Sequence, residues 1–452
     1  MSTALIVLAA GMGTRMNSDL PKVLHKVAGA PLLVHAMKSG AGFAPDRTVV
    51  VAGHGAEQVA AAARAFDENA EVVLQEEQHG TGHAVQMAED TLKGFTGDAI
   101  VLYGDTPFIR PETLADMAAA RAAHDVVVLG FEAADPGRYG RLVMSGDRLE
   151  KIVEFKDASD DERAIILCNS GVIMVDAGTL FSLLADVSND NASGEYYLTD
   201  IVAIANARGL SATSVTCDEA ETMGINSRPQ LAQADAAFQS RARAEALENG
   251  VTLEAPETVF FAHDTVIGRD TVIEPNVVFG PGVTVETGAH IRAFSHLEGC
   301  HVSRGGVIGP YARLRPGAEL SEDVHIGNFV EIKNATLAAG AKANHLSYIG
   351  DADVGEASNI GAGTITCNYD GVMKHRTTIG ARAFVGSNTM FIAPATLGDE
   401  AMTATGTVFT GDVPDGAMVI GRAEAQIKPG FARKFMQMLK AKKARQSKDE
   451  DS

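Results

Sequence analysis

Residues 267–297 read IGRDTVIEPNVVFGPGVTVETGAHIRAFSHL. An apolar residue occupies every sixth position of this stretch, namely Ile267, Ile273, Phe279, Val285, Ile291 and Leu297. A sixfold period is typical of a parallel β-helix, in which short strands form flat sides and tight turns form corners. Three hexapeptides make one triangular coil, so the stretch predicts a stack of such coils.

The same period continues toward the C-terminus, with short interruptions. It resumes at Ile308, Leu314, Leu320, Ile326 and Ile332, then at Ile349, Val354 and Ile360, and finally at Ile379, Val385, Phe391 and Leu397. Two breaks are polar: residues 366–376 interrupt the hexads, and a cluster around His345 replaces large apolar residues. Insertions in a solenoid commonly carry function, so we expect functional residues at both breaks. A purely structural solenoid remains the alternative.

The length and composition of the whole chain limit the class of protein. The chain has 452 residues, enough for two or three domains, and a formal net charge of -20. This charge disfavours nucleic acid as a partner. No apolar run is long enough to cross a membrane, no basic residue precedes the apolar N-terminal segment, and the four cysteines are widely spaced. We therefore expect a cytoplasmic protein without membrane insertion.

The N-terminal half follows a different pattern, in which short apolar runs alternate with Ala-rich helical stretches. The predicted strands are Leu5 to Leu8, Thr48 to Ala52, Glu71 to Leu74, Ala99 to Tyr103 and Val126 to Phe131. This rhythm predicts an α/β domain with a mostly parallel sheet, which binds ligands beyond the carboxyl ends of its strands. We assign residues 1–226 to this domain, 227–250 to a linker helix, and 251–452 to the β-helix domain with its tail.

The first predicted strand leads directly into a glycine-rich turn. Residues 8–16 read LAAGMGTRM and are followed by Leu20-Pro21-Lys22. Backbone N–H groups in such a turn can hold phosphate, and the cations Arg15 and Lys22 can stabilise charge on a pyrophosphate leaving group. The turn alone could equally be structural. Asp105, at the end of another predicted strand, is either a turn cap or a ligand of Mg2+.

Taken together, these residues resemble the sugar-nucleotidyltransferase superfamily. Residues 19–25 (DLPKVLH) and 78–84 (QHGTGHA) are similar to segments of N-acetylglucosamine-1-phosphate uridylyltransferases. The resemblance implies in-line attack of a sugar 1-phosphate on UTP, without a protein nucleophile, and Mg2+ held by Asp105 and Asn226. It implies that the nucleotide and sugar contact Leu8, Ala9, Ala10, Gly11, Lys22, Gln75, Gly80, Thr81, Tyr103, Gly104, Asp105, Gly140, Glu154, Asn169 and Asn226. Of these, Gly140, Glu154 and Asn169 would bind the N-acetylglucosamine group.

Four segments of the repeat domain, residues 313–317, 328–333, 345–348 and 359–364, closely resemble glucosamine-1-phosphate N-acetyltransferases. This resemblance implies a left-handed β-helix and a homotrimer with active sites between neighbouring prisms. It makes His345 the general base and assigns the amino-sugar phosphate to Arg315, Lys333, Tyr348, Asn359 and Lys374. Acetyl-CoA would contact Ala362, Asn368, Tyr369, Ser387, Thr405 and Arg422. Thr405 departs from the Ala of the family pattern, so its contact would come from its backbone.

The two halves together resemble one bifunctional family that acetylates glucosamine 1-phosphate and then uridylylates the product to UDP-N-acetylglucosamine. The family supplies precursors for peptidoglycan and, in Gram-negative bacteria, lipopolysaccharide. Two alternatives remain: a different sugar nucleotidyltransferase, such as an ADP-glucose pyrophosphorylase with a regulatory β-helix, and an inactive nucleotide-sugar sensor. The tail from Lys428 to Lys448 has eight basic residues and no acidic one. It could attract the CoA phosphates, although a solvated helix end is the simpler interpretation.

Overall fold

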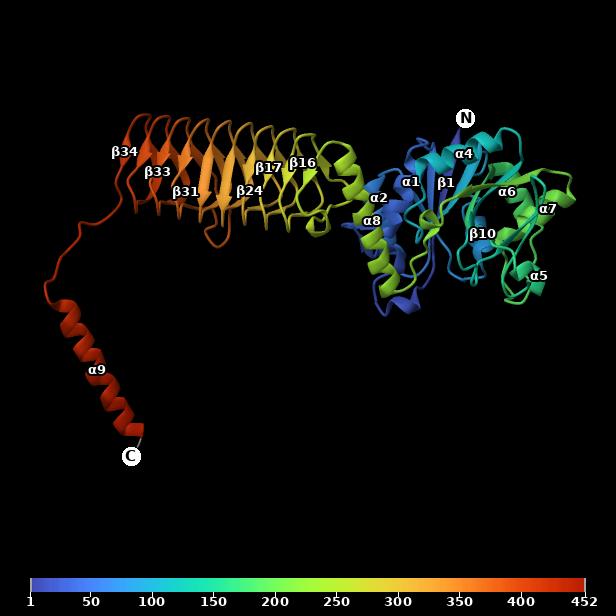
Figure 1. The fold of residues 1–452 in the computed structure, drawn as a ribbon, viewed down its shortest axis with the longest axis horizontal. Coiled ribbons are helices and arrows are strands. Elements are labelled where there is room, and N and C mark those ends of the chain that lie inside the picture. The colour runs from blue at the N-terminus through green and yellow to red at the C-terminus, as the bar shows by residue number, and fades with distance from the viewer. Residues whose placement is uncertain (1, 451–452) are drawn as a thin grey trace. The chain divides into compact units, whose positions relative to one another are not determined.

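A computed structural model describes residues 2–450 of the chain (Figure 1). Within it the chain forms two compact units. The first comprises residues up to 266 together with 278–283, and the second comprises 267–277 together with the residues from 284 onward. The three-part division at residues 226 and 250 stays a prediction. No helix of the described part is both long and apolar enough to span a membrane.

The first unit is an α/β domain. Its main sheet contains β1 (Thr3–Ala9), β4 (Arg47–Ala52), β5 (Glu71–Leu74), β6 (Asp98–Tyr103), β7 (Val126–Glu132), β8 (Arg141–Ser145), β9 (Arg148–Val153), β10 (Leu167–Asp176) and β11 (Ala212–Cys217). Its α-helices are α1 (Leu32–Ala41), α2 (Ala56–Phe66), α3 (Thr81–Gln86), α4 (Pro111–Arg121), α5 (Asp160–Arg163), α6 (Ala177–Leu184), α7 (Ile201–Ala207) and α8 (Arg228–Glu248). Short elements are β2 (Lys26–Val27), β3 (Ala30–Pro31), β12 (Thr252–Leu253) and the 3-10 helices η1 (Thr14–Met16), η2 (Lys22–Leu24), η3 (Leu198–Asp200), η4 (Glu219–Thr222) and η5 (Pro256–Thr258).

The main sheet has the strand order β11-β7-β10-β6-β1-β4-β5. Strand β1 is parallel to both of its neighbours, pairing Leu8 with Val51 of β4 and with Tyr103 of β6. The residues of β1 point alternately to the two faces, where Ile6 and Val7 belong to separate apolar cores. Burial on both faces explains why β1 is a continuous apolar run. The predicted strands and the mostly parallel sheet are confirmed.

One central strand of this sheet was not predicted from the sequence. Strand β10 is antiparallel to both β6 and β7, and its pairing with β7 shifts register between Asn169 and Ile173. Residues 169–171 interrupt its apolar pattern at this irregularity. The strand therefore lacks the continuous hydrophobic period from which strands are predicted. The β8–β9 hairpin, attached to the sheet through β10, was also missed.

The predicted linker helix is present as α8, which begins after Ser227 and ends before Asn249. The Ser227 hydroxyl accepts the N–H of Gln230, and Pro229 occupies the first turn, so the helix has both expected start signals. Ala234 is completely buried in a small apolar cluster with Leu32 and Phe108. One face of α8 therefore packs within the first unit.

The repeat domain is built from very short strands. They are β13 (Val266–Ile267), β14 (Val272–Ile273), β15 (Val278–Phe279), β16 (Val283–Val285), β17 (His290–Ile291), β18 (His296–Leu297), β19 (Cys300–Val302), β20 (Val307–Ile308), β21 (Arg313–Leu314), β22 (Ala318–Leu320), β23 (His325–Asn328), β24 (Glu331–Leu337), β25 (Lys342–His345), β26 (Tyr348–Val354), β27 (Asn359–Ile360), β28 (Ile365–Cys367), β29 (Thr377–Ile379), β30 (Phe384–Val385), β31 (Met390–Leu397), β32 (Met402–Thr403), β33 (Val408–Val413) and β34 (Met418–Val419). A helix, α9 (Phe431–Glu450), ends the described chain.

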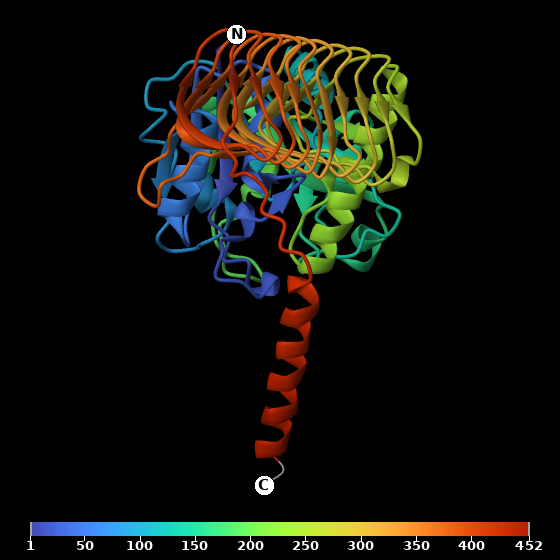
Figure 2. The ribbon, with the colours of Figure 1, turned by 90° about the vertical axis from the view of Figure 1, so that its left-hand side faces the viewer.

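These strands stack into parallel ladders, one on each side of the coils. One ladder runs β17-β20-β23-β25-β27-β30-β32-β34, the second includes β18, β21 and the start of β24, and the third includes β19, β22 and the end of β24. Figures 1 and 2 show the coils lying against one another in a regular stack. The hexad residues fill its interior: Leu297, Leu314 and Ile332 are completely buried and lie one above another. The predicted parallel β-helix is confirmed.

The corners of the coils use left-handed backbone conformations, including several that do not use glycine. Phe294, Tyr311 and Phe329 follow one another along one corner with φ near 60°, and their exposed rings stack. Between β28 and β29 the regular stack is interrupted, and the intervening segment projects as a loop, orange in Figure 1. The predicted break at residues 366–376 is therefore confirmed as a protruding segment.

Two candidate active sites

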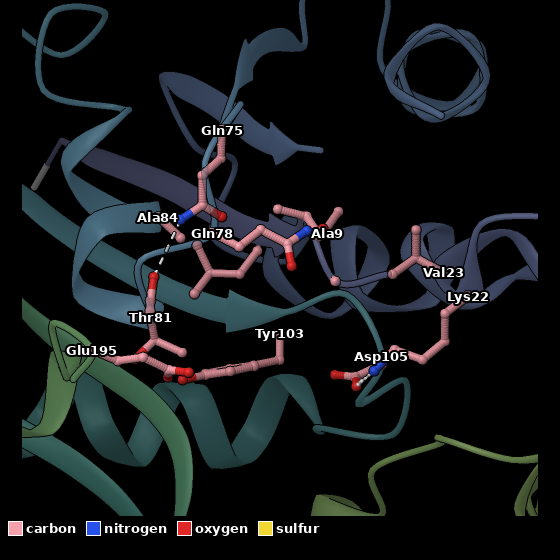
Figure 3. A pocket seen from close by; sticks show the side chains of 14 residues that line it. Ala9, Lys22, Val23, Gln75, Gln78, Thr81, Ala84, Tyr103, Asp105 and Glu195 are labelled. Atoms are coloured by element: carbon pink, nitrogen blue, oxygen red, sulfur yellow. Dashed lines mark hydrogen bonds and ion pairs between the residues drawn. The ribbon is translucent and has the colours of Figure 1, made fainter. Parts of the chain in front are cut away.

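A cavity of about 320 Å3 lies at the carboxyl ends of the parallel strands of the first unit (Figure 3). Its lining residues come from the ends of β1 and β6, η2, the segment after β5, α3 and the segment before η3. They are Leu8, Ala9, Ala10, Gly11, Lys22, Val23, Gln75, Gln78, Gly80, Thr81, Ala84, Tyr103, Asp105 and Glu195. Most residues predicted from the sequence to bind the nucleotide are brought together here.

The glycine-rich turn is held closely against the segment that carries Lys22. Gly13 has a φ of 63°, and a Cβ at Gly13 would lie 2.5 Å from Cβ of Lys22, so this position requires glycine. The Arg228 side chain donates to the carbonyl of Met16 at 3.2 Å, which ties the end of the turn to α8. Arg15 itself is exposed on η1, outside the residues that line the cavity.

Lys22 is placed between the two residues predicted to hold Mg2+. Its ammonium group forms an ion pair with Asp105 and donates to Oδ1 of Asn226 at 2.9 Å. The backbone supports this arrangement, because the Ile225 N–H donates to the Asp105 carbonyl at 3.0 Å. Two oxygen atoms from residues 121 positions apart in the sequence thus converge on one cationic group.

The opposite side of the cavity is organised by amides and an imidazole. Gln75 is buried, and its amide group contacts the Gly80 carbonyl at 3.2 Å and Nδ1 of His83 at 3.1 Å. Gln78 donates to the Ala10 carbonyl at 2.6 Å and thereby connects this segment to the glycine-rich turn. Gln78 lies in the segment 78–84 but was not predicted to bind the nucleotide, because a glutamine in a polar loop carries no distinguishing signal.

The three residues predicted to bind the sugar also lie together. The Asn169 N–H donates to the Gly140 carbonyl at 2.9 Å, and a Cβ on Gly140 would lie 3.4 Å from Oε1 of Glu154. Burial raises the pKa of the Glu154 carboxyl, although a hydrogen bond from Thr199 opposes the shift. Burial and the nearby Glu154 charge also raise the pKa of Tyr103. Because Tyr103 lines the cavity, it connects the three sugar-binding candidates to the nucleotide side.

In the β-helix, His345 faces a second cavity of about 210 Å3. Its Nδ1 lies 3.1 Å from Oδ1 of Asn328, the residue beside it on the preceding coil. Because an amide oxygen can only accept, Nδ1 donates to it and the lone pair of Nε2 is left available. The side chain is exposed, so a substrate can reach it.

Basic residues predicted to bind phosphate gather on an adjacent side of the coils. Arg315 forms a 2.8 Å ion pair with Glu331, which raises the pKa of the arginine. Lys333 and Lys374 lie against each other, and this contact between two amines lowers the pKa of Lys333. Crowded cations of this kind are suited to a dianionic phosphate, whose charge would relieve their repulsion.

Four of the six predicted acetyl-CoA residues follow one corner of the stack, whereas Asn368 and Tyr369 lie in the protruding segment between β28 and β29. The N–H groups of Gly363, Asn388 and Gly406 donate to the carbonyls of His345, Ala362 and Ser387, respectively. Ala362, Ser387 and Thr405 therefore occupy equivalent positions on successive coils beyond His345. The guanidinium of Arg422 donates to the Thr405 carbonyl at the end of this row. A corner row of this kind can contact an extended ligand.

Comparisons with known proteins assign the chain to a family. Residues 5–169 match the model of the MobA-like NTP transferase domain, and residues 264–299 match the bacterial transferase hexapeptide model. Proteins called bifunctional protein GlmU from Ruegeria sp. (strain TM1040) and Ruegeria pomeroyi are both 70% identical to the chain, over 99% of its length and all of theirs. The chain belongs to the GlmU family.

As a member of the GlmU family, the chain is a bifunctional transferase. It acetylates glucosamine 1-phosphate from acetyl-CoA, and it transfers a uridylyl group from UTP to N-acetylglucosamine 1-phosphate. The GlmU protein of Paracoccus denitrificans is 63% identical over 97% of the chain and 98% of its own length. A solved UDP-glucose pyrophosphorylase complexed with UDP-glucose aligns with a TM-score of 0.44 at 18% identity, covering 53% of this chain and 100% of that chain. Membership of the GlmU family disagrees with both alternatives, the regulatory β-helix and the inactive sensor.

One predicted amino-sugar residue of this GlmU family member lies apart from the others. Asn359 pairs with Lys342 and Phe384 in the β25-β27-β30 ladder, whereas Lys333 pairs with Gly350 in the β24-β26 ladder. Tyr348 is on the same ladder as Lys333, beside Glu331. Within one chain, Asn359 and Lys333 are therefore on different sides of the coil.

Proposed function

We propose that uridylyl transfer takes place in the cavity at the carboxyl ends of β1 and β6. The convergence of Asp105 and Asn226 on the Lys22 ammonium group is the observation that supports this most strongly. The backbone of residues 8–11 would hold the triphosphate of UTP, and Gln75, Gly80 and Thr81 would contact its base. Gly140, Glu154 and Asn169 would bind the N-acetylglucosamine group, with Tyr103 and Gly104 between the two substrates.

The oxygens of Asp105 and Asn226 suit Mg2+, because this ion prefers a few protein oxygens together with phosphate and water. Both already contact a cation, Lys22, and the described residues contain no cluster of three or more His, Cys, Asp or Glu that could compete for a metal ion. Bound Mg2+ would neutralise the charge of the phosphate oxygens. Lys22 would then be free to contact the phosphates itself.

Uridylyl transfer in this arrangement needs no protein nucleophile. A phosphate oxygen of N-acetylglucosamine 1-phosphate attacks the α-phosphorus of UTP, the bond to the bridging oxygen of the β-phosphate breaks, and pyrophosphate leaves. Lys22 and Arg15 stabilise the charge on the leaving group. The protein contributes by aligning the two substrates and by holding their charges.

For acetyl transfer, we propose that His345 acts as general base. The amine of glucosamine 1-phosphate attacks the thioester carbonyl of acetyl-CoA, Nε2 of His345 takes the proton, and the carbon–sulfur bond breaks as the CoA thiolate leaves. Asn328 fixes the tautomer that this step requires. Arg315, Lys333, Tyr348, Asn359 and Lys374 bind the amino-sugar phosphate, and Ala362, Asn368, Tyr369, Ser387, Thr405 and Arg422 bind acetyl-CoA.

We further propose that the chain works as a homotrimer in the cytoplasm. A site formed between two copies would let Asn359 of one chain meet Lys333 of another, which explains why these residues lie on different sides of one coil. Light scattering after size exclusion should give three times the mass of the chain. Mixing the inactive variants Asn359→Ala and Lys333→Ala should restore part of the acetylation activity, because some sites in mixed trimers would contain both native residues.

The decisive assay is substrate-dependent product release by the purified protein. Free thiol should be released from acetyl-CoA with glucosamine 1-phosphate but not with glucosamine 6-phosphate. Pyrophosphate should be released from UTP only with N-acetylglucosamine 1-phosphate and Mg2+. Absence of thiol release would contradict the proposed acetyltransferase site, and Mg2+-independent release of pyrophosphate would contradict the proposed metal ligands.

A further inference from the structure

Asp351 is a buried carboxylate at the corner where the protruding loop leaves the stack. It lies within β26 but has a φ of 49°, a left-handed conformation that Asp and Asn adopt more readily than most residues. On the preceding coil Asn334 occupies the same corner, since Lys333 pairs with Gly350 and Ala335 pairs with Ala352. On the following coil that corner is occupied by Asn368, where the loop begins.

The two oxygens of Asp351 connect these three coils. Oδ1 accepts a hydrogen bond from Nδ2 of Asn334 at 2.5 Å, and Oδ2 accepts one from Nδ2 of Asn368. Asn368 is also buried, so its amide has little access to water. Asn334 is exposed, so loss of the carboxylate would leave one buried donor, Nδ2 of Asn368, without its acceptor, which is costly.

The loop is held at its other end by the same strand. The Arg376 guanidinium contacts both carboxylate oxygens of Asp353 at 2.5 Å and the Ala352 carbonyl at 3.2 Å. The loop therefore leaves and rejoins the stack against Asp351 and Asp353, two residues apart on β26. This anchoring fixes where the loop places Tyr369 and Lys374.

The Asp351 carboxylate also attracts the positively charged Lys333 and Lys374. Burial raises its pKa, but hydrogen bonds from Asn334 and Asn368 and the charges of Lys374 and Lys333 outweigh this, so its pKa falls below the ordinary value. Lys333 faces Lys374, Arg315 and Asp351. Of these three, only Asp351 favours the charged form of Lys333. Without this carboxylate Lys333 would bind its proton less strongly.

We propose that Asp351 is a positioning residue for acetyl transfer, which anchors the loop of residues 368–376 through Asn368 and supplies the negative charge that Lys333 faces in the site for the amino-sugar phosphate. The proposal rests on the roles proposed above for Asn368, Tyr369 and Lys374. It assigns one buried carboxylate to both substrates, acetyl-CoA through the start of the loop and glucosamine 1-phosphate through the lysine pair.

The test is Asp351→Asn in the full-length protein, with both activities measured on each preparation. The amide cannot accept from both asparagines. We expect the KM for both acetylation substrates to rise about tenfold, the size expected from a lost hydrogen bond to a charged group, with a smaller change in kcat. The alkaline limb of kcat/KM for glucosamine 1-phosphate should move to lower pH, and amide hydrogen exchange in residues 369–376 should become faster.

Matched controls separate this role from a general effect on folding. Asp323 also has a left-handed backbone, with a φ of 56°, but it lies on an exposed corner away from the loop, so Asp323→Asn should leave all of these quantities unchanged. Asn334→Gly, which removes one partner of Asp351 at a left-handed position, should raise both KM values by a smaller factor. Uridylyl transfer should be unchanged in every variant.

Unchanged KM values in Asp351→Asn would overturn the proposal, and so would unchanged hydrogen exchange in the loop. A pH profile identical to that of the wild type would overturn the part that concerns Lys333. Lys374→Ala provides the separate test of the proposed function. If that variant kept its KM for glucosamine 1-phosphate, the role of Lys374 would be wrong, whereas hydrogen exchange in Asp351→Asn would still report on the anchor.

Discussion

Lys22 donates a hydrogen bond to Asn226 across 2.9 Å, although the two residues are 204 positions apart in the chain. The same ammonium group pairs with Asp105, so three segments meet at one positive charge. Lys22 lies just after the glycine-rich turn, Asp105 follows β6, and Asn226 immediately precedes the N-cap of α8. This meeting point connects the phosphate-binding turn to the proposed metal ligands.

The first prediction concerns Asp105. Asp105→Ala should lower the rate of uridylyl transfer by a factor of about 100 or more, because it removes a charged ligand and leaves Lys22 without its ion pair. Acetylation should stay within twofold of the wild-type rate. Pyrophosphate and thiol release, measured on the same preparation, check both statements, and loss of both activities in a folded variant would contradict the separation of the two sites.

The second prediction is the reciprocal one. His345→Ala should lower kcat for acetylation by a factor of about 100 to 10,000, the range usual for a general base, and leave uridylyl transfer unchanged. Thiol release from acetyl-CoA, measured beside pyrophosphate release on the same preparation, checks both statements. Thiol release at the wild-type rate by His345→Ala would show that another group takes the proton.

The third prediction follows from the raised pKa of Glu154. Because its pKa is higher in the folded state than in the unfolded state, burial of this carboxyl costs least stability at low pH and most once pH exceeds the folded pKa. Glu154→Gln should therefore raise the Tm of the first unit at pH 8, by about 2 °C if the change is worth 1 kcal/mol. This gain should disappear at pH 4.

The same substitution should weaken binding of N-acetylglucosamine 1-phosphate, since the carboxylate accepts hydrogen bonds more strongly than an amide. Calorimetric scans at the two pH values, together with KM for the sugar phosphate, test both effects. A stability gain that is equal at pH 4 and pH 8 would show that ionisation of Glu154 is not its cause.

The fourth prediction concerns the interior of the β-helix. Leu314 is completely buried between Leu297 and Ile332 of the neighbouring coils. Leu314→Ala should lower the free energy of unfolding by about 2–5 kcal/mol through lost burial and an unfilled cavity. Leu346→Ala, at a side chain that is 62% exposed, is the control and should change stability by less than about 0.5 kcal/mol. Denaturant titration of both variants measures the difference.

The β-helix could be predicted largely from its sequence because every coil must bury an apolar residue at each sixth position. The interior accepts apolar residues at fixed spacing along each coil, and Leu297, Leu314 and Ile332 all obey this rule. The protruding loop was predictable for the same reason, since residues 366–376 break that rule. Strands β8 and β10 have no comparable constraint, and the irregularity at Asn169 conceals their pattern.

The residues that line the cavity proposed for uridylyl transfer could be predicted to the extent that they occur in short motifs. The glycine-rich turn and Asp105 follow strands, where ligand-binding residues of a parallel sheet are expected. Gln78 and Asp351 could not be found in this way, because their importance depends on which distant residues they contact. Ala10 is far from Gln78 in sequence, and Asn334 and Asn368 become neighbours of Asp351 only when the coils are stacked.

The stacking of coils also sets the order in which parts of the second unit lose structure. In a quasi-one-dimensional array each coil is stabilised only by its neighbours, so fraying begins at the end that has just one neighbour. Thr405 lies between β32 and β34, on the last coils, whereas Arg315 and Lys333 lie several coils inward. Warming would therefore loosen the contacts proposed for acetyl-CoA before those proposed for the sugar phosphate, so the affinity for acetyl-CoA would be the first to fall as the temperature rises.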